Sequence, residues 1–154
     1  MKNDLQHYLP LGVYAWDEAA WIGFALGGCA LCSTSFLVNF TKALNALYIF
    51  TLNGKVLRPD AYMPPFSQLL GRWFWAGFTL YLLFMAGLVV HHYQLHRSGS
   101  KSIYLMKRIG NPWELRRRCW TFPLVGTVMG LLLLVALLLG YHQLYRNTTP
   151  PQFL

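Results

Sequence analysis

The chain has few charged residues, which make up 12% of its 154 residues, whereas a soluble domain usually carries about 25%. Hydrophobic residues account for 55%. Together these values indicate that lipid is the main solvent of the chain. The formal net charge of +8 alone could suggest a nucleic-acid partner, but seven of the 13 Lys and Arg residues lie between Arg97 and Arg118, between two apolar stretches. We therefore interpret the basic charge as a membrane-topology signal and expect no nucleic-acid partner.

Several chemical motifs are also missing. The three cysteines lie in or beside apolar stretches and form no disulfide framework. Gly54-Lys55 lacks the upstream glycine and the following Ser or Thr of a phosphate-binding loop, so the chain should not bind ATP itself. We predict no catalytic residue, no cofactor and no metal site, and we expect that the protein is not an enzyme.

The positions of the acidic residues also bear on function. None of four acidic residues lies inside an expected span, and each is outside the spans or at an edge: Asp17, Glu18, Asp60 and Glu114. A proton-coupled carrier normally places ionisable groups at depth in the membrane. The positions of these carboxylates therefore argue against such a carrier.

Three stretches have the roughly 20 apolar residues that a helix needs to cross a bilayer. They are residues 19–41, 73–94 and 119–145. We predict an all-α integral membrane protein with three transmembrane helices, in which residues 1–154 form a single transmembrane domain. In the first span the small residues Gly23, Gly27 and Gly28 predict close helix packing, more plausibly within the protein than in a dedicated dimer.

The segment between the first two spans holds further elements. Residues 43–53 could prolong the first helix or lie along the membrane interface, and Asn53-Gly54 predicts a turn. Residues 57–65 contain three prolines and cannot form a continuous helix. Residues 66–72 predict a short interfacial helix leading into the second span, with Trp73 and Trp75 at the headgroup level.

The excess of Lys and Arg orients the spans. With three spans, the N-terminus and the loop over residues 96–118 share one side, with eight basic residues against five on the other. We therefore expect a multi-pass protein of the cell membrane, with the N-terminus and this loop in the cytoplasm.

The basic loop contains helix signals of its own. Ser98 or Ser100 can cap a short helix over residues 101–109, and Gly110 suits the position just past its end. Asn111-Pro112 then predicts the start of a second helix that runs into the third span. A helix as short as 101–109 cannot form a core alone and must bury its apolar side chains on another surface.

The sequence KSIYLMKRIGNPWELRRR in this loop resembles the coupling helix of ATP-binding-cassette exporter permeases of the second type. The order of lead-in helix, spans and coupling helix also resembles the first half of such a permease, and the likeness covers residues 66–123. It departs from the family pattern at Ile109-Gly110, where Leu-Pro is usual, and in having three spans rather than six. The resemblance therefore implies a small subunit that needs a partner.

In such permeases the coupling helix docks on the ATPase subunit. The resemblance implies that the partners are an ATPase subunit, which would hold any ATPase activity, and another membrane subunit or a second copy of the chain. The docking residues would be Ile103, Tyr104, Leu105 and Met106, with Lys107 and Arg108 supplying charge complementarity. The alternative for this loop is that it lies on anionic lipid, with residues 103–106 dipping into the bilayer interface.

Two other functions stay open. The protein could be a membrane-embedded assembly or regulatory protein without any ATPase. Cys29 and Cys32, which share a helix face, could also belong to a membrane thiol redox protein, although two small buried thiols are the default interpretation. His92 and His96 have a metal-binding spacing, but histidines beside lipid headgroups are the simpler interpretation of His91, His92 and His96.

Overall fold

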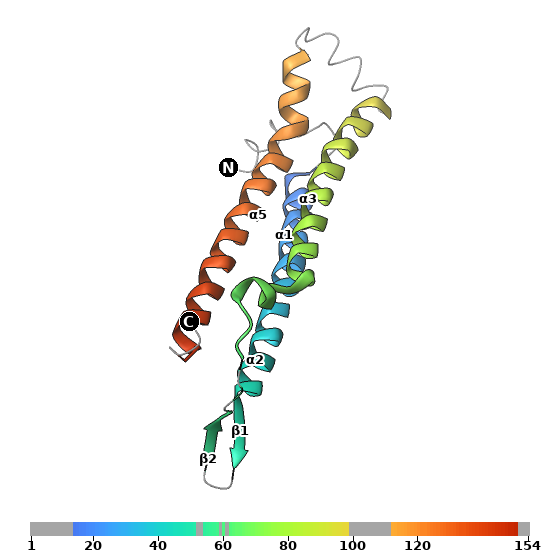
Figure 1. Ribbon diagram of the computed structural model, residues 1–154. Helices are drawn as coiled ribbons and strands as arrows, with labels where there is room; N and C mark the ends of the chain where they lie inside the picture. The colour runs from blue at the N-terminus through green and yellow to red at the C-terminus, as the bar shows by residue number, and fades with distance from the viewer. Residues whose placement is uncertain (1–13, 52–53, 59, 61, 99–111, 151–154) are drawn as a thin grey trace. The chain divides into compact units, whose positions relative to one another are not determined.

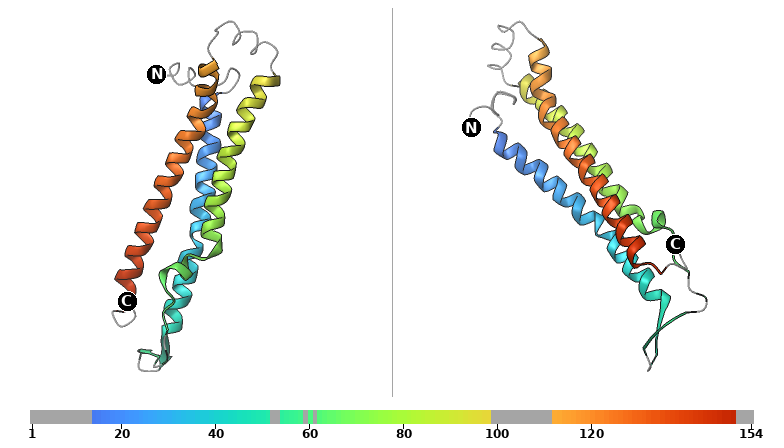
Figure 2. Two further views of the ribbon diagram at one scale, coloured as in Figure 1. Left: turned by 45° about the horizontal axis from the view of Figure 1, so that its top comes forward. Right: turned by 90° about the vertical axis from the view of Figure 1, so that its left-hand side faces the viewer.

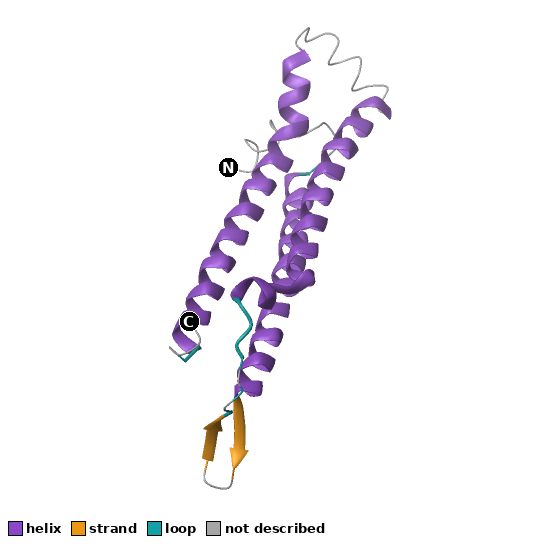
Figure 3. Ribbon diagram, viewed as in Figure 1, coloured by secondary structure: helices purple, strands orange, loops and turns teal. Residues whose placement is uncertain are grey.

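A computed structural model describes residues 14–51, 54–58, 60, 62–98 and 112–150. Three helical stretches are long and apolar enough to cross a membrane: Ala15–Leu47, Phe66–Leu95 and Arg116–Thr148. Each contains one of the three predicted spans. The prediction of a helical membrane protein with three spans is therefore confirmed (Figures 1 and 3).

The first stretch consists of two helices, α1 (Ala15–Ser33) and α2 (Ser35–Leu47). They meet at Thr34, whose backbone N–H donates to the Leu31 carbonyl three residues earlier, at 3.1 Å. The Thr34 hydroxyl donates to the same carbonyl at 2.7 Å. Hydroxyls that bond to the preceding turn in this way compete with the regular helix pattern. The helix is thus interrupted at a run of polar residues, Ser33, Thr34 and Ser35.

Of the two alternatives left open for residues 43–53, prolongation of the first helix holds as far as Leu47, after which the chain forms a hairpin that was not predicted. Strands β1 (Tyr48–Thr51) and β2 (Gly54–Leu57) pair antiparallel, with Thr51 opposite Gly54. The chain therefore reverses direction between Thr51 and Gly54, next to the turn predicted at Asn53-Gly54, of which Asn53 lies outside the described residues. Gly54 has a φ of +124°, a backbone conformation that glycine adopts without steric cost.

Helix α3 (Phe66–Ser98) begins directly after Pro65 and is interrupted at Gly71, where φ is 69° and ψ is 174°. The helix changes direction there, so that residues 66–70 form a separate turn, whereas the lead-in helix was predicted over residues 66–72 (Figure 2). Side chains are strongly disfavoured in this region of backbone space, which explains a glycine at the corner. Trp73 and Trp75 follow the corner and are exposed.

Helix α5 (Pro112–Thr148) starts at Pro112, as the Asn111-Pro112 signal predicted. Proline suits the first turn of a helix because its missing N–H would have no partner there. The helix contains a second proline, Pro123, in its interior. The short helix predicted over 101–109 lies outside the described residues and stays a prediction.

The chain forms two compact units, and α1, α3 and α5 contribute residues to both. Unit 1 comprises residues 1–27 and 79–132. Its described buried apolar side chains come from all three helices and include Ile22, Tyr81, Met85 and Leu88. The Tyr81 hydroxyl donates to the Gly126 carbonyl at 2.6 Å, which links α3 to α5 within this unit.

Unit 2 comprises residues 28–78 and 133–154, and aromatic rings fill its core. The Phe36 ring lies 4.5 Å from that of Tyr141 and 5.5 Å from that of Phe66, measured between centroids. Asn39, a polar residue of α2, donates from Nδ2 to the Leu69 carbonyl at 3.1 Å. Asn39 therefore satisfies a carbonyl at the end of the lead-in turn, where Gly71 interrupts the backbone ladder.

Candidate functional site

The most polar buried cluster in the described structure lies in unit 1 and joins Glu18 of α1 to His92 of α3. The His92 side chain is fully buried, and Glu18 is 5% exposed. Oε1 of Glu18 lies 2.9 Å from Nε2 of His92. Buried ionisable side chains in a membrane protein are costly unless they are paired, and they are commonly functional.

The other ring nitrogen of His92 contacts the third helix of this unit. Nδ1 lies 3.1 Å from the backbone carbonyl oxygen of Cys119 in α5. In an uninterrupted helix that carbonyl would accept a hydrogen bond from the N–H four residues later. The residue four positions later is Pro123, which has no N–H. Pro123 thus frees the Cys119 carbonyl, and His92 fills the vacant position, as neighbouring helices do for prolines in membrane spans.

Hydrogen-bond chemistry assigns the protons on the ring. A carbonyl oxygen only accepts, so Nδ1 of His92 must carry a proton and donate it. Nε2 then faces the Glu18 carboxyl, and a bond between them needs one proton, either on the ring or on the carboxyl. The second carboxyl oxygen, Oε2 of Glu18, is buried without a hydrogen-bond partner among the described residues.

This cluster adds to one expectation and corrects another. Glu18 lies near the start of the first membrane-spanning stretch, at an edge as expected, and it is buried and paired there. His92 was expected beside lipid headgroups, but its ring is buried between the Glu18 carboxyl and the freed Cys119 carbonyl. His91 is exposed, whereas the side chain of His96 is not described. The described residues contain no group of three potential metal ligands.

The sequence held one usable signal for this site. Pro123 stands inside the third apolar stretch, and a proline there leaves a carbonyl that another helix must satisfy. His92 lies in another apolar stretch and offers a suitable donor. No rule of local spacing, however, connects residues so far apart in the chain.

Glycine contacts differ from the predicted ones. A Cβ atom added at Gly23, Gly27 or Gly28 would meet no atom within 4 Å, so the close packing predicted there is wrong for the described structure. The close approach occurs instead at Gly126 and Gly130 of α5, where Met85 and Tyr81 of α3 lie against the glycines. Position in the fold, not the number of glycines, decides which helix face is packed.

The cysteines of α1 behave as packing residues. Cys29 is buried, and its thiol donates to the Gly77 carbonyl at 3.2 Å. A Cβ at Gly77 would lie 2.7 Å from the Cβ of Cys32, so the two helices approach closely at the thiols. Cys29, Cys32 and Cys119 are all free thiols. These contacts agree with the default interpretation of small buried thiols.

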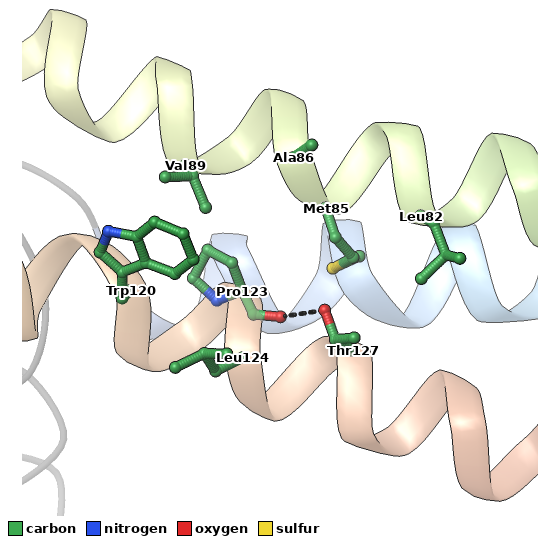
Figure 4. A pocket seen from close by; sticks show the side chains of 8 residues that line it. All are labelled: Leu82, Met85, Ala86, Val89, Trp120, Pro123, Leu124 and Thr127. Carbon is green, nitrogen blue, oxygen red and sulfur yellow. Dashed lines mark hydrogen bonds between the residues drawn. The ribbon is translucent and has the colours of Figure 1, made fainter.

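Unit 1 also has an apolar groove between α3 and α5, with a volume of about 350 Å³ (Figure 4). Its lining residues have no ionisable side chain: Leu82, Met85, Ala86, Val89, Trp120, Pro123, Leu124 and Thr127. The Thr127 hydroxyl is occupied, because it donates to the Pro123 carbonyl at 2.8 Å (Figure 4). The groove can hold an acyl chain or apolar side chains of another helix, and it offers no group for catalysis.

The predicted docking residues 103–108 lie outside the described residues. The structure describes the helices on either side of them, α3 up to Ser98 and α5 from Pro112. Comparison of the chain with protein-family models, curated proteins and solved structures finds no match. Function must therefore be argued from the residues and their contacts.

Proposed function

We propose that the chain is a small membrane subunit of an ATP-binding-cassette exporter, and that residues 101–109 dock on an ATPase subunit. The N-terminus and the loop over 96–118 then face the cytoplasm of a cell whose plasma membrane holds the protein. The proposal rests on the sequence resemblance together with one feature of unit 1, the link formed by Glu18, His92 and the Cys119 carbonyl.

This link lies near the proposed docking segment in the sequence, on each of the two helices that flank the segment. His92 lies about two helical turns before the end of α3, and Cys119 lies about two turns after the start of α5. Nδ1 of His92 binds α5 and Nε2 binds α1, so three helices are joined at one residue. A displacement of the segment would therefore move the three joined helices together, which is what coupling to a motor requires.

The link also bears on topology. It places the start of α1 beside the end of α3 and the start of α5 within unit 1 (Figure 1). A chain with three spans requires this arrangement, because the N-terminus and the segment between α3 and α5 must share a side. The high density of Lys and Arg in that segment supports the cytoplasm as this side.

The surfaces of the spans support a partner in the membrane. Only 22%, 33% and 17% of the residues in the most apolar window of the three spans are buried by the chain itself. The remaining surface is covered by lipid or by other helices. We propose that part of it contacts another membrane subunit or a second copy of the chain, since the permeases that the sequence resembles have six spans.

Co-purification from native membranes tests the docking proposal. We expect an ATPase subunit to accompany the chain and to be lost from the Tyr104→Asp and Met106→Asp variants. Burial of one large apolar side chain contributes about 1.5–3 kcal/mol, so each variant should weaken the complex by roughly tenfold to a hundredfold. Tyr62→Asp is the matched control, because Tyr62 is 72% exposed and lies in a different connecting segment.

Two outcomes would contradict the proposal. One is an ATPase complex that stays intact in both aspartate variants. The other is a native particle that contains no ATPase, which would favour a membrane-embedded assembly or regulatory protein, or a loop that lies on anionic lipid.

A further inference from the structure

Glu18 and His92 belong to the link that supports the docking proposal, but neither that proposal nor the resemblance assigns a proton to the pair. We infer that the two side chains bind one proton between them, and that this shared proton holds α1 against α3 within unit 1. The ligand of the site is thus a single proton. The inference rests on the hydrogen-bond geometry of the cluster and does not depend on the identity of the docking partner.

The first step of the argument is that the orientation and tautomer of the ring are fixed. The Cys119 carbonyl accepts from Nδ1 at 3.1 Å, and Pro123 removes the backbone donor that would otherwise compete for this oxygen. A proton therefore stays on Nδ1, and every change of protonation in the cluster occurs at Nε2 or at the Glu18 carboxyl.

The second step concerns the contact of 2.9 Å between Nε2 and Oε1. With one proton present, either the imidazolium donates to the carboxylate or the carboxylic acid donates to the neutral ring. The two forms differ only in which atom holds the proton, and both leave the pair with no net charge. Without the proton, two lone pairs would face each other and a buried net negative charge would remain, which is costly in an apolar interior.

The third step is the state of Oε2 of Glu18, which is buried without a partner among the described residues. A buried carboxylate normally has hydrogen bonds to both oxygens, and leaving one unmade is costly. The shared proton lowers this cost on either atom of the pair, because it removes the net negative charge that would otherwise be buried beside Oε2.

Other titratable and charged side chains stand near the pair on the same three helices. Asp17 and His91 are neighbours of Glu18 and His92 in sequence, and both are exposed, so they do not share the enclosed site. Arg116 and Arg117 are exposed, and Arg118 is half-buried directly before Cys119. Among the described side chains of these helix ends, the Cys119 thiol is also buried, Tyr14 is exposed, and the Tyr93 hydroxyl accepts from Trp120 Nε1 at 3.2 Å.

Spectroscopy of the purified full chain tests the inference directly. Infrared spectroscopy detects a protonated carboxyl group, and nitrogen NMR of labelled histidine detects the protons on each ring nitrogen. The Glu18→Gln variant identifies the Glu18 carboxyl band by its loss, and His92→Gln identifies the ring signals. In the wild type at neutral pH we expect Nδ1 of His92 to be protonated, together with one further proton, seen either as the carboxyl band or as an Nε2–H signal.

Glu18→Gln is also the decisive variant, because the glutamine amide keeps the size of the side chain and can donate to Nε2. The shared proton is then absent, so we expect a neutral ring with Nδ1 still protonated, and loss of whichever signal the wild type shows, the carboxyl band or the Nε2–H signal. Asp17→Asn is the matched control and should leave the His92 signals unchanged.

Either of two results would overturn the inference. The first is a wild-type spectrum with an ionised Glu18 beside a neutral His92, since no proton would then be shared. The second is a Glu18→Gln variant in which neither the carboxyl band nor the ring signals change. Both can be seen whether or not an ATPase accompanies the chain, so failure of the proton site and failure of the docking proposal are distinguishable.

Discussion

Replacing Gly130 by alanine perturbs the contact between α3 and α5 in unit 1. The added Cβ would overlap Cε1 of Tyr81 and would lie 2.9 Å from Cδ1. Carbon atoms in contact normally lie about 3.5–4.0 Å apart, so the ring would have to move. Tyr81 cannot easily turn away, because it is buried and its hydroxyl is bound to the Gly126 carbonyl.

The expected loss of stability follows from this overlap. Extra carbon forced into a well-packed interior typically costs about 1–3 kcal/mol. Alanine also favours a helix over glycine by up to about 1 kcal/mol, which partly offsets the loss. Gly140→Ala on the same helix is the matched control, because a Cβ at Gly140 would meet no atom within 4 Å. The difference between the two variants isolates the packing cost, which we expect to be about 1–3 kcal/mol.

The assay is the free energy of unfolding of the purified protein in mixed micelles of mild detergent and sodium dodecyl sulfate. A Tyr81→Ala background provides an internal check, since the penalty of Gly130→Ala should vanish there once the ring is gone. Equal stability of Gly130→Ala and Gly140→Ala would refute the packing argument. A penalty that persisted in the Tyr81→Ala background would refute the role given to the ring.

Two further substitutions test unit 2. Gly71→Ala should destabilise this unit by about 1–3 kcal/mol, because φ is 69° at this position and the new Cβ would lie 2.9 Å from Nδ2 of Asn39. The same unfolding assay measures the loss. An unchanged free energy of unfolding would contradict the backbone conformation observed at Gly71. Cys29→Ser keeps a donor for the Gly77 carbonyl, so stability should change by only about 1 kcal/mol. The proposed binding of an ATPase subunit should persist, whereas loss of activity with stability intact would favour a thiol redox protein.

Local pattern predicted the elements that depend on neighbours in sequence. The three spans follow from the length of apolar runs, because a helix in lipid must satisfy its own backbone groups. The start of α5 follows from Asn111-Pro112, and the separate lead-in turn follows from the prolines and the glycine around it. The turn before Gly54 was predicted in the same way, although the pairing of β1 with β2 was not.

The candidate site depended on residues that no local pattern connects. Glu18 was predicted only to lie outside the spans or at an edge, and its position in the sequence does not show what packs against it. The glycine prediction failed similarly, because Gly126 and Gly130 face Met85 and Tyr81, whereas a Cβ at Gly23, Gly27 or Gly28 would meet no described atom within 4 Å.

The sequence by itself determined that the chain is a helical membrane protein with three spans, because spans are set by local hydrophobicity and helix geometry. The sequence also shows the concentration of Lys and Arg between Arg97 and Arg118. The coupling role of this segment stays a proposal that rests on the resemblance. Only the tertiary structure decided that His92 of α3 binds the Cys119 carbonyl of α5, which Pro123 leaves without a backbone donor, and that Glu18 of α1 binds the other ring nitrogen of His92. The physical reason is that a freed hydrogen-bonding group specifies that a partner must exist, whereas the packing of the helices decides which residue supplies it.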